Sequence, residues 1–247
     1  MTCLFMNKSL KKIVLLPGMD GSGELFRGLV GALPQGLETE TLWYPADRYM
    51  NYGELAGTLR GAIPVDEPFV LVAESYGTPL AILIAALEPP NLQGIVLCAG
   101  FATSPLRGWR RTLVWDLAPL LSLSHVTMPK FMTRYLMVGD EAPRGLVELV
   151  TGAVSWVTPK VLYARVREML NVDVRAELAQ VRVPVLYVQA SKDRVVDPAC
   201  VEEMQAVRPG QVVVMDAPHL VLQREPVLGA EMIVGFVKEL GEGSLWE

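Results

Sequence analysis

The sequence has 247 residues, with 22 lysines and arginines against 27 aspartates and glutamates, so its formal net charge is −5. Hydrophobic residues make up 51 % of it, which excludes an intrinsically disordered chain. The acidic balance, without any block of basic residues, argues against binding to a nucleic-acid backbone. The longest uninterrupted apolar run, residues 80–87, is far shorter than the roughly 18 residues of a membrane span, so we expect none.

Three cysteines, Cys3, Cys98 and Cys200, lie far apart, and the sequence has only two histidines. Neither residue type occurs at the spacing of a zinc site, so we expect no bound metal. An odd and sparse cysteine count is typical of a reducing compartment. The N-terminal lysines follow a short apolar patch, whereas those of a signal peptide precede a longer one. The chain is therefore expected to be cytoplasmic.

Strands and helices alternate in the predicted secondary structure. In chain order, strands are predicted at residues 13–16, 38–43, 69–73, 94–98, 183–189 and 211–215. Helices are predicted at residues 24–33, 52–63, 76–87 and 226–240, with a further helix between the last two strands. This alternation predicts an α/β fold, in which a mostly parallel central sheet has helices on both faces.

Residues 101–175 interrupt the alternation. They contain three of the five tryptophans and several methionines, but no apolar run typical of a buried strand. We interpret them as a helical cap inserted into a core made of residues 1–100 and 176–247. His125 lies in this insertion, where a histidine is expected to be a surface or packing residue.

The pentapeptide Ala73-Glu74-Ser75-Tyr76-Gly77 lies between a predicted buried strand and a predicted helix. A nucleophile elbow needs this context, and its tight turn needs small residues two positions before and two after the nucleophile. Ala73 and Gly77 meet that need. Ser75 is thus the candidate nucleophile, placed at a helix N-terminus that favours an anion. The alternative is that Ser75 only caps the helix.

A glycine-rich stretch, Leu16-Pro17-Gly18-Met19-Asp20-Gly21-Ser22-Gly23, follows the first predicted strand. It fits neither the dinucleotide-binding fingerprint nor a P-loop, because the glycine spacing and the Gly-Lys-Ser/Thr ending are missing. Its backbone amides can instead face a cavity. An oxyanion hole needs two donors, and the backbone N–H groups of Met19 and Tyr76 are the candidates. A plain strand-to-helix turn is the alternative.

Asp193 and His219 follow the last two predicted strands. A carboxylate at the carboxyl end of a parallel strand can reach a catalytic crevice, so Asp193 is the candidate acid. Asp197 competes with it, but Asp197-Pro198 before a helix is more typical of an N-cap with proline at the first helical position. The chain order Ser75, Asp193, His219 is the order of an α/β-hydrolase triad.

On these motifs the sequence resembles the α/β-hydrolase superfamily, along nearly its whole length. It is similar to small capped bacterial carboxylesterases, such as the pimeloyl-acyl-carrier-protein methyl ester esterases. Two departures stand out: Ala73 replaces the first elbow glycine, and Pro17-Gly18 replaces the frequent His-Gly. The second departure is shared with thioesterase-like members, so an acyl-thioester substrate stays open. A serine at position 75 argues against a dehalogenase, for which the resemblance would require an aspartate.

The resemblance implies a serine carboxylesterase that needs no cofactor and no metal. Ser75 would attack the ester carbonyl, His219 would take its proton, and Asp193 would orient the imidazole. Apolar side chains of the cap predict a pocket for an apolar acyl or aryl group, although each of them could simply pack the cap on the core. The candidate pocket residues are Met128, Phe131, Met132, Trp156 and Leu162.

Two other functions remain open. One is a thioesterase or acyltransferase acting on carrier-bound acyl chains, with Arg107, Arg110 and Arg111 docking an acidic acyl carrier protein. A solvated turn explains the same three arginines. The other is a weakly catalytic receptor that keeps the triad for ligand capture. The sequence predicts neither the physiological ester nor the oligomeric state.

Overall fold

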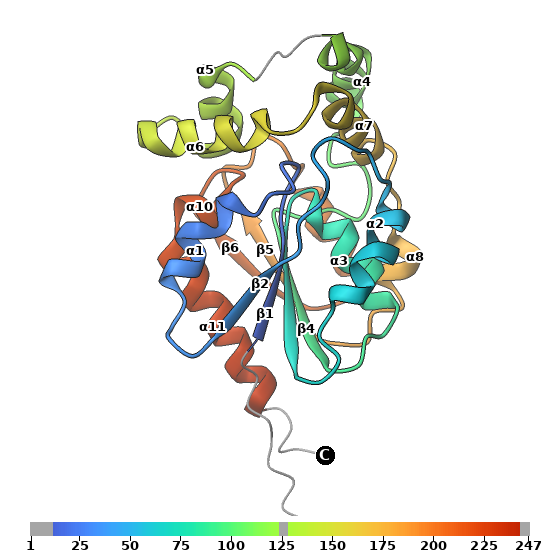
Figure 1. Cartoon of the computed structure of the whole chain (residues 1–247), viewed down its shortest axis with the longest axis vertical. Coiled ribbons are helices and arrows are strands. Elements are labelled where there is room, and N and C mark those ends of the chain that lie inside the picture. The colour runs from blue at the N-terminus through green and yellow to red at the C-terminus, as the bar shows by residue number, and fades with distance from the viewer. Residues whose placement is uncertain (1–11, 124–127, 243–247) are drawn as a thin grey trace, which may run out of the picture.

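The computed structural model describes residues 12–123 and 128–242. Its centre is a sheet of six parallel strands in the order β2-β1-β3-β4-β5-β6 (Figure 1). The strands are β1 (Lys12–Leu16), β2 (Glu38–Thr41), β3 (Phe69–Glu74), β4 (Leu92–Cys98), β5 (Val185–Ala190) and β6 (Gln211–Met215). The predicted α/β fold with a parallel sheet is therefore confirmed.

Helices cover both faces of the sheet because successive side chains of its inner strands are apolar and point to opposite sides. In β1, Ile13 and Leu15 pack on one face, while Val14 and Leu16 pack on the other. The first face is covered by α1 (Arg27–Ala32), α10 (Val221–Arg224) and α11 (Pro226–Glu242). The second is covered by α2 (Tyr52–Leu59), α3 (Gly77–Ala86), α8 (Arg175–Leu178) and α9 (Ala199–Val207).

Some predicted elements differ at their ends. The helix predicted for residues 24–33 begins as a 3₁₀ turn, η1 (Glu24–Phe26), before α1, and α2 likewise ends in the 3₁₀ turn η2 (Arg60–Ala62). The strand predicted for residues 38–43 ends at Thr41, because the chain then turns toward Gly21. The Gly21 carbonyl accepts a hydrogen bond from the Tyr44 amide at 3.0 Å.

Within the described residues, the segment between β4 and α8 consists of helices joined by loops, with one isolated β-bridge between Thr103 and Asp173. It contains α4 (Gly108–Leu123), α5 (Lys130–Thr133), the π-helix η3 (Arg134–Val138), α6 (Arg144–Ser155) and α7 (Pro159–Met169). These helices lie beyond the carboxyl ends of the strands (Figure 1). The two ends of the segment meet at its base, where the Val174 amide donates to the Ala102 carbonyl at 2.9 Å. The division into a core and a cap of residues 101–175 stays a prediction.

Cys98 and Cys200 are buried free thiols, whereas Cys3 and His125 lie outside the described residues. Across residues 12–123 and 128–242, no helix combines the length and the apolar character needed to cross a membrane.

Candidate active site

Ser75 lies in a strained turn between β3 and α3. Its φ of 53° is in the left-handed region, which non-glycine residues rarely adopt. Two bonds hold the turn: the Ser75 amide donates to the Cys98 carbonyl at 2.9 Å, and the Thr78 amide donates to the Ser75 carbonyl at 2.9 Å. A Cβ at Gly77 would lie 2.6 Å from the carbonyl oxygens of both Leu16 and Pro17. The close approach of β1 therefore requires glycine at position 77.

The three predicted triad residues lie together, although they come from three different loops. Nε2 of His219 is 2.9 Å from Oγ of Ser75, and Nδ1 of His219 is 2.8 Å from Oδ2 of Asp193. The other Asp193 oxygen accepts the amides of Val195 and Val196 at 2.7 and 2.9 Å. With its second oxygen held by these amides, the Asp193 carboxylate has one oxygen left to orient the imidazole.

The His219 side chain is buried, and two opposing effects act on its pKa. Burial lowers the pKa, while the charge and hydrogen bond of Asp193, together with the charge of Glu74, raise it; the net shift is upward from the ordinary 6.5. The Asp193 carboxylate thus favours the charged imidazolium form of His219 over its neutral form. This arrangement can perform general-base activation of a serine hydroxyl.

The loop with the first predicted oxyanion donor lies next to the elbow. A Cβ at Gly18 would lie 3.8 Å from the Ser75 Cβ. Within the described part of the chain, neither the Met19 nor the Tyr76 amide has a backbone acceptor. Both amides are therefore free to donate to a third group.

The direction of each amide follows from the carbonyl that precedes it, because C=O and N–H point in opposite directions across a trans peptide. The Gly18 carbonyl accepts the Gly21 amide at 3.1 Å, so the Met19 N–H points away from that turn. The Ser75 carbonyl accepts the Thr78 amide and, at 2.8 Å, its hydroxyl, so the Tyr76 N–H points out of the α3 N-terminus. The orientation of each N–H group is thus fixed by the hydrogen bonds of the preceding carbonyl. An oxyanion hole requires donors of fixed orientation.

Asp197, the competing acid, lies outside the triad. Its carboxylate accepts the Ala199 amide at 3.0 Å at the start of α9, which agrees with the predicted capping role. One detail of that prediction is wrong: α9 begins at Ala199, so Pro198 precedes the helix.

The three arginines predicted as a docking patch or a solvated turn are engaged within the chain. Arg107 forms an ion pair with Glu203 at 2.8 Å. Arg110 donates to the Arg194 carbonyl, and Arg111 donates to the Leu170 carbonyl at 2.9 and 3.1 Å. Partners within the chain thus occupy donors that a carrier protein would need.

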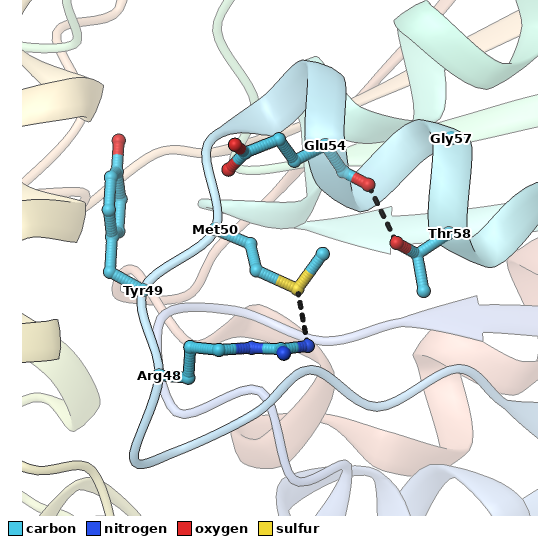
Figure 2. A pocket seen from close by; sticks show the side chains of 6 residues that line it. All are labelled: Arg48, Tyr49, Met50, Glu54, Gly57 and Thr58. Carbon is cyan, nitrogen blue, oxygen red and sulfur yellow. Dashed lines mark hydrogen bonds between the residues drawn. The ribbon is translucent and has the colours of Figure 1, made fainter.

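The predicted pocket residues are mostly exposed. Phe131 and Trp156 are 72 and 78 % exposed, Met128 and Met132 are partly exposed, and Leu162 is half-buried. Their role in a pocket stays a prediction. Two open hollows lie elsewhere, one beside α2 and one between α7 and the start of α2, and no triad residue lines either of them. Figure 2 shows the first, lined by Arg48, Tyr49, Met50, Glu54, Gly57 and Thr58.

Sequence reasoning missed three charged residues near the site: Glu74 and Arg165, which are buried, and Glu168, which is partly buried. Glu74 is 1 % and Arg165 is 2 % exposed. One signal was readable for Arg165. It is four residues after Val161 and four before Met169, so a charge occupies the apolar stripe of an amphipathic helix. Nothing in the local pattern around Glu74 indicated that its side chain is buried.

The chain has many structural relatives of low sequence identity. A hydrolase from Oleispira antarctica has a TM-score of 0.79 at 13 % identity, covering 92 % of this chain and 91 % of that chain. An esterase from Exiguobacterium antarcticum has a TM-score of 0.78 at 16 % identity, covering 94 % and 93 %. An enol-lactonase from Burkholderia xenovorans has a TM-score of 0.74 at 16 % identity, covering 93 % and 92 %. At such identities these similarities establish the fold.

No curated protein matches the sequence significantly, so the similarity to pimeloyl-acyl-carrier-protein methyl ester esterases stays a prediction. A family model described as "Alpha/beta hydrolase family" matches residues 13–230, which include the elbow, the glycine-rich loop, Asp193 and His219. The chain therefore belongs to the α/β hydrolase family.

Proposed function

We propose that this hydrolase is a serine carboxylesterase that cleaves esters with an apolar acyl or aryl group through an acyl-enzyme on Ser75. One observation carries the proposal: Ser75 Oγ, the His219 ring and the Asp193 carboxylate form a continuous hydrogen-bonded chain, with distances of 2.9 and 2.8 Å. Such a chain, ending in a serine on a strained turn at a helix N-terminus, suits acyl transfer.

In the proposed reaction, Ser75 Oγ attacks the ester carbonyl carbon while His219 Nε2 takes the hydroxyl proton. The oxyanion of the tetrahedral intermediate accepts hydrogen bonds from the Met19 and Tyr76 amides. The intermediate collapses when the C–O bond to the alcohol breaks and His219 protonates the leaving oxygen. His219 then deprotonates a water molecule, which attacks the acyl-enzyme and releases the acid and the free serine.

The preference for an apolar acyl or aryl group is supported by the surroundings of His219. Leu220, the next residue, is buried in an apolar cluster with Leu25 and with Val138 of η3. The Leu220 amide also donates to the Met137 carbonyl at 2.9 Å, which fastens η3 beside the histidine. A charged acyl group near this cluster would lose hydration without gaining a partner.

The proposal is tested with p-nitrophenyl esters of graded chain length, using the wild type, Ser75→Ala and the matched control Ser155→Ala on α6. Ser155 is exposed, and among the described residues its hydroxyl donates only to the Gly152 carbonyl, so its loss should leave turnover unchanged. Turnover lost only in Ser75→Ala supports the proposal, and the chain-length optimum measures the acyl pocket. A wild type inactive on every ester overturns it, and an ester linked to an acyl carrier protein is then the next substrate to assay.

A further inference from the structure

Helix α7 directs two charged side chains, Arg165 and Glu168, toward the core. They are three residues apart and so lie on one side of the helix. Arg165 is almost fully buried, in the same stripe as Val161 and Met169. A buried guanidinium is costly unless its donors are satisfied, so its partners indicate what keeps it there.

Those partners are backbone carbonyls near the elbow. Arg165 Nη1 donates to the Met19 carbonyl at 2.6 Å, and Nη2 donates to the Pro45 carbonyl at 2.8 Å. The guanidinium also lies 5.4 Å from the ring centre of Tyr44. The Tyr44 hydroxyl in turn donates to the Pro17 carbonyl. Three successive carbonyls of the glycine-rich loop, those of Pro17, Gly18 and Met19, therefore accept hydrogen bonds. Arg165 is the donor to the last of them.

Glu168 binds the residue that carries the second candidate donor, Tyr76. Its Oε2 accepts the Tyr76 hydroxyl at 2.6 Å, and its Oε1 accepts the Tyr52 amide at 2.6 Å. The Tyr52 ring stacks on the Tyr76 ring with centres 4.7 Å apart. The Tyr76 side chain is therefore clamped between α7 and α2, and the backbone of the same residue carries the second free amide.

We propose that Arg165 and Glu168 of α7 are positioning residues. They hold the two candidate oxyanion donors, the backbone N–H groups of Met19 and Tyr76, in place. The inference rests on the proposed function. Arg165 acts through the Met19 backbone and Glu168 through the Tyr76 side chain, and neither has to touch the ester. Misplaced donors weaken binding of the transition state more than binding of the substrate, so their loss lowers kcat and leaves KM nearly unchanged.

The matched variants are Arg165→Met and Arg167→Met. Arg167 is on the same helix, but its guanidinium stacks on the Trp115 ring, 3.1 Å from the centre. We expect Arg165→Met to lower kcat by about 10- to 100-fold, less than the roughly 10²–10³ of losing a donor outright. Arg165→Lys should recover part of the rate, because an ammonium can still donate to the Met19 carbonyl. Arg167→Met should turn over like the wild type.

A second readout separates positioning from a merely structural role. An alkyl boronic acid forms a tetrahedral adduct with a nucleophilic serine, so its inhibition constant should rise in step with the fall in kcat/KM. Inhibition by the carboxylate product should change little. Glu168→Gln tests the contact with the Tyr76 hydroxyl by the same two measurements. If Arg165→Met does not fold, Arg165→Lys and Glu168→Gln are measured in its place.

The inference is overturned if the folded variants keep wild-type kcat and boronate affinity, or if the loss lies entirely in KM. Labelling of the wild type with a fluorophosphonate distinguishes a failure of this inference from a failure of the proposed function. A labelled Ser75 with unaffected Arg165 and Glu168 variants overturns the positioning role alone. A wild type that is neither labelled nor active overturns both.

Discussion

Glu74 and Gln223 form a partly buried hydrogen bond next to Ser75: Gln223 Nε2 lies 2.8 Å from Glu74 Oε2. Glu74 is the residue before Ser75, and its other oxygen accepts the Leu222 amide at 3.4 Å. The carboxyl thus connects the elbow to α10, which begins two residues after His219. Burial raises its pKa from 4.5 to about 7, despite these two bonds.

This raised pKa predicts that stability falls as the pH rises. Between pH 4.5 and 7 the folded protein binds the Glu74 proton and the unfolded chain does not, so the free energy of unfolding decreases through that window. The shift corresponds to at most about 3 kcal/mol above pH 7. Glu74→Gln removes this cost, and its amide can donate to Gln223 Oε1, which has no partner among the described residues.

Urea unfolding of the wild type and Glu74→Gln at pH 8 and pH 5 checks this prediction. The variant should be more stable at pH 8, and its advantage should shrink toward pH 5. Glu231→Gln, an exposed change on α11, serves as the control and should show no such dependence. An equal difference at both pH values would contradict a titrating Glu74.

The pKa of His219 predicts the acid limb of the activity profile. Only the neutral imidazole can accept the Ser75 proton, and the Asp193 carboxylate outweighs burial to raise the His219 pKa above 6.5. We therefore expect kcat/KM to fall below an inflection that lies above pH 6.5. Asp193→Asn should move the inflection to lower pH and cut the plateau, by about 10⁴-fold in a comparable triad.

The measurement is kcat/KM of a short p-nitrophenyl ester across pH 5 to 9. Asp197→Asn is the matched control, because its carboxylate contacts the start of α9 and not the imidazole. An unmoved inflection in Asp193→Asn would assign the titration to another group.

Gly77→Ala should destabilise the fold and abolish turnover. The new Cβ would lie 2.6 Å from two backbone oxygens, so β1 and α3 have to move apart. Such overpacking costs typically about 1–3 kcal/mol. Gly57→Ala in α2 is the control: a Cβ there meets nothing within 4 Å, so alanine should stabilise the helix by about 0.5–1 kcal/mol. Urea unfolding of both variants gives the comparison, and equal effects would contradict the close approach.

Trp156→Ala and Phe131→Ala test the proposed acyl pocket. Both side chains are largely exposed, so stability should change by no more than about 0.5 kcal/mol. If they line the pocket when an ester is bound, KM for long acyl chains should rise while KM for acetyl esters stays the same. Trp109→Ala, an equally exposed change on α4, is the comparison. Unchanged KM values at every chain length would remove both residues from the pocket.

Sequence alone determined the strands and the chemistry of the loops, because both are local properties. The apolar run at residues 69–73 has few options other than a buried parallel strand. The tight turn at Ser75 likewise needs small neighbours, and the pentapeptide shows them. Ser75, Asp193 and His219 each follow a predicted strand, so all three were expected at the carboxyl ends of strands, where parallel topology brings loops together.

Only the tertiary structure decided which charged side chains turn inward around the site. Arg165 is 146 residues from Met19 along the chain, and Glu168 is 92 residues from Tyr76. No local pattern encodes such pairs, because the partners of Arg165 are backbone carbonyls that every residue carries. The sequence likewise did not predict that Phe131 and Trp156 are exposed. An apolar side chain on a helix faces inward or outward according to how the helix docks on the rest of the protein. Docking is a sum over many distant contacts, and local spacing does not determine it.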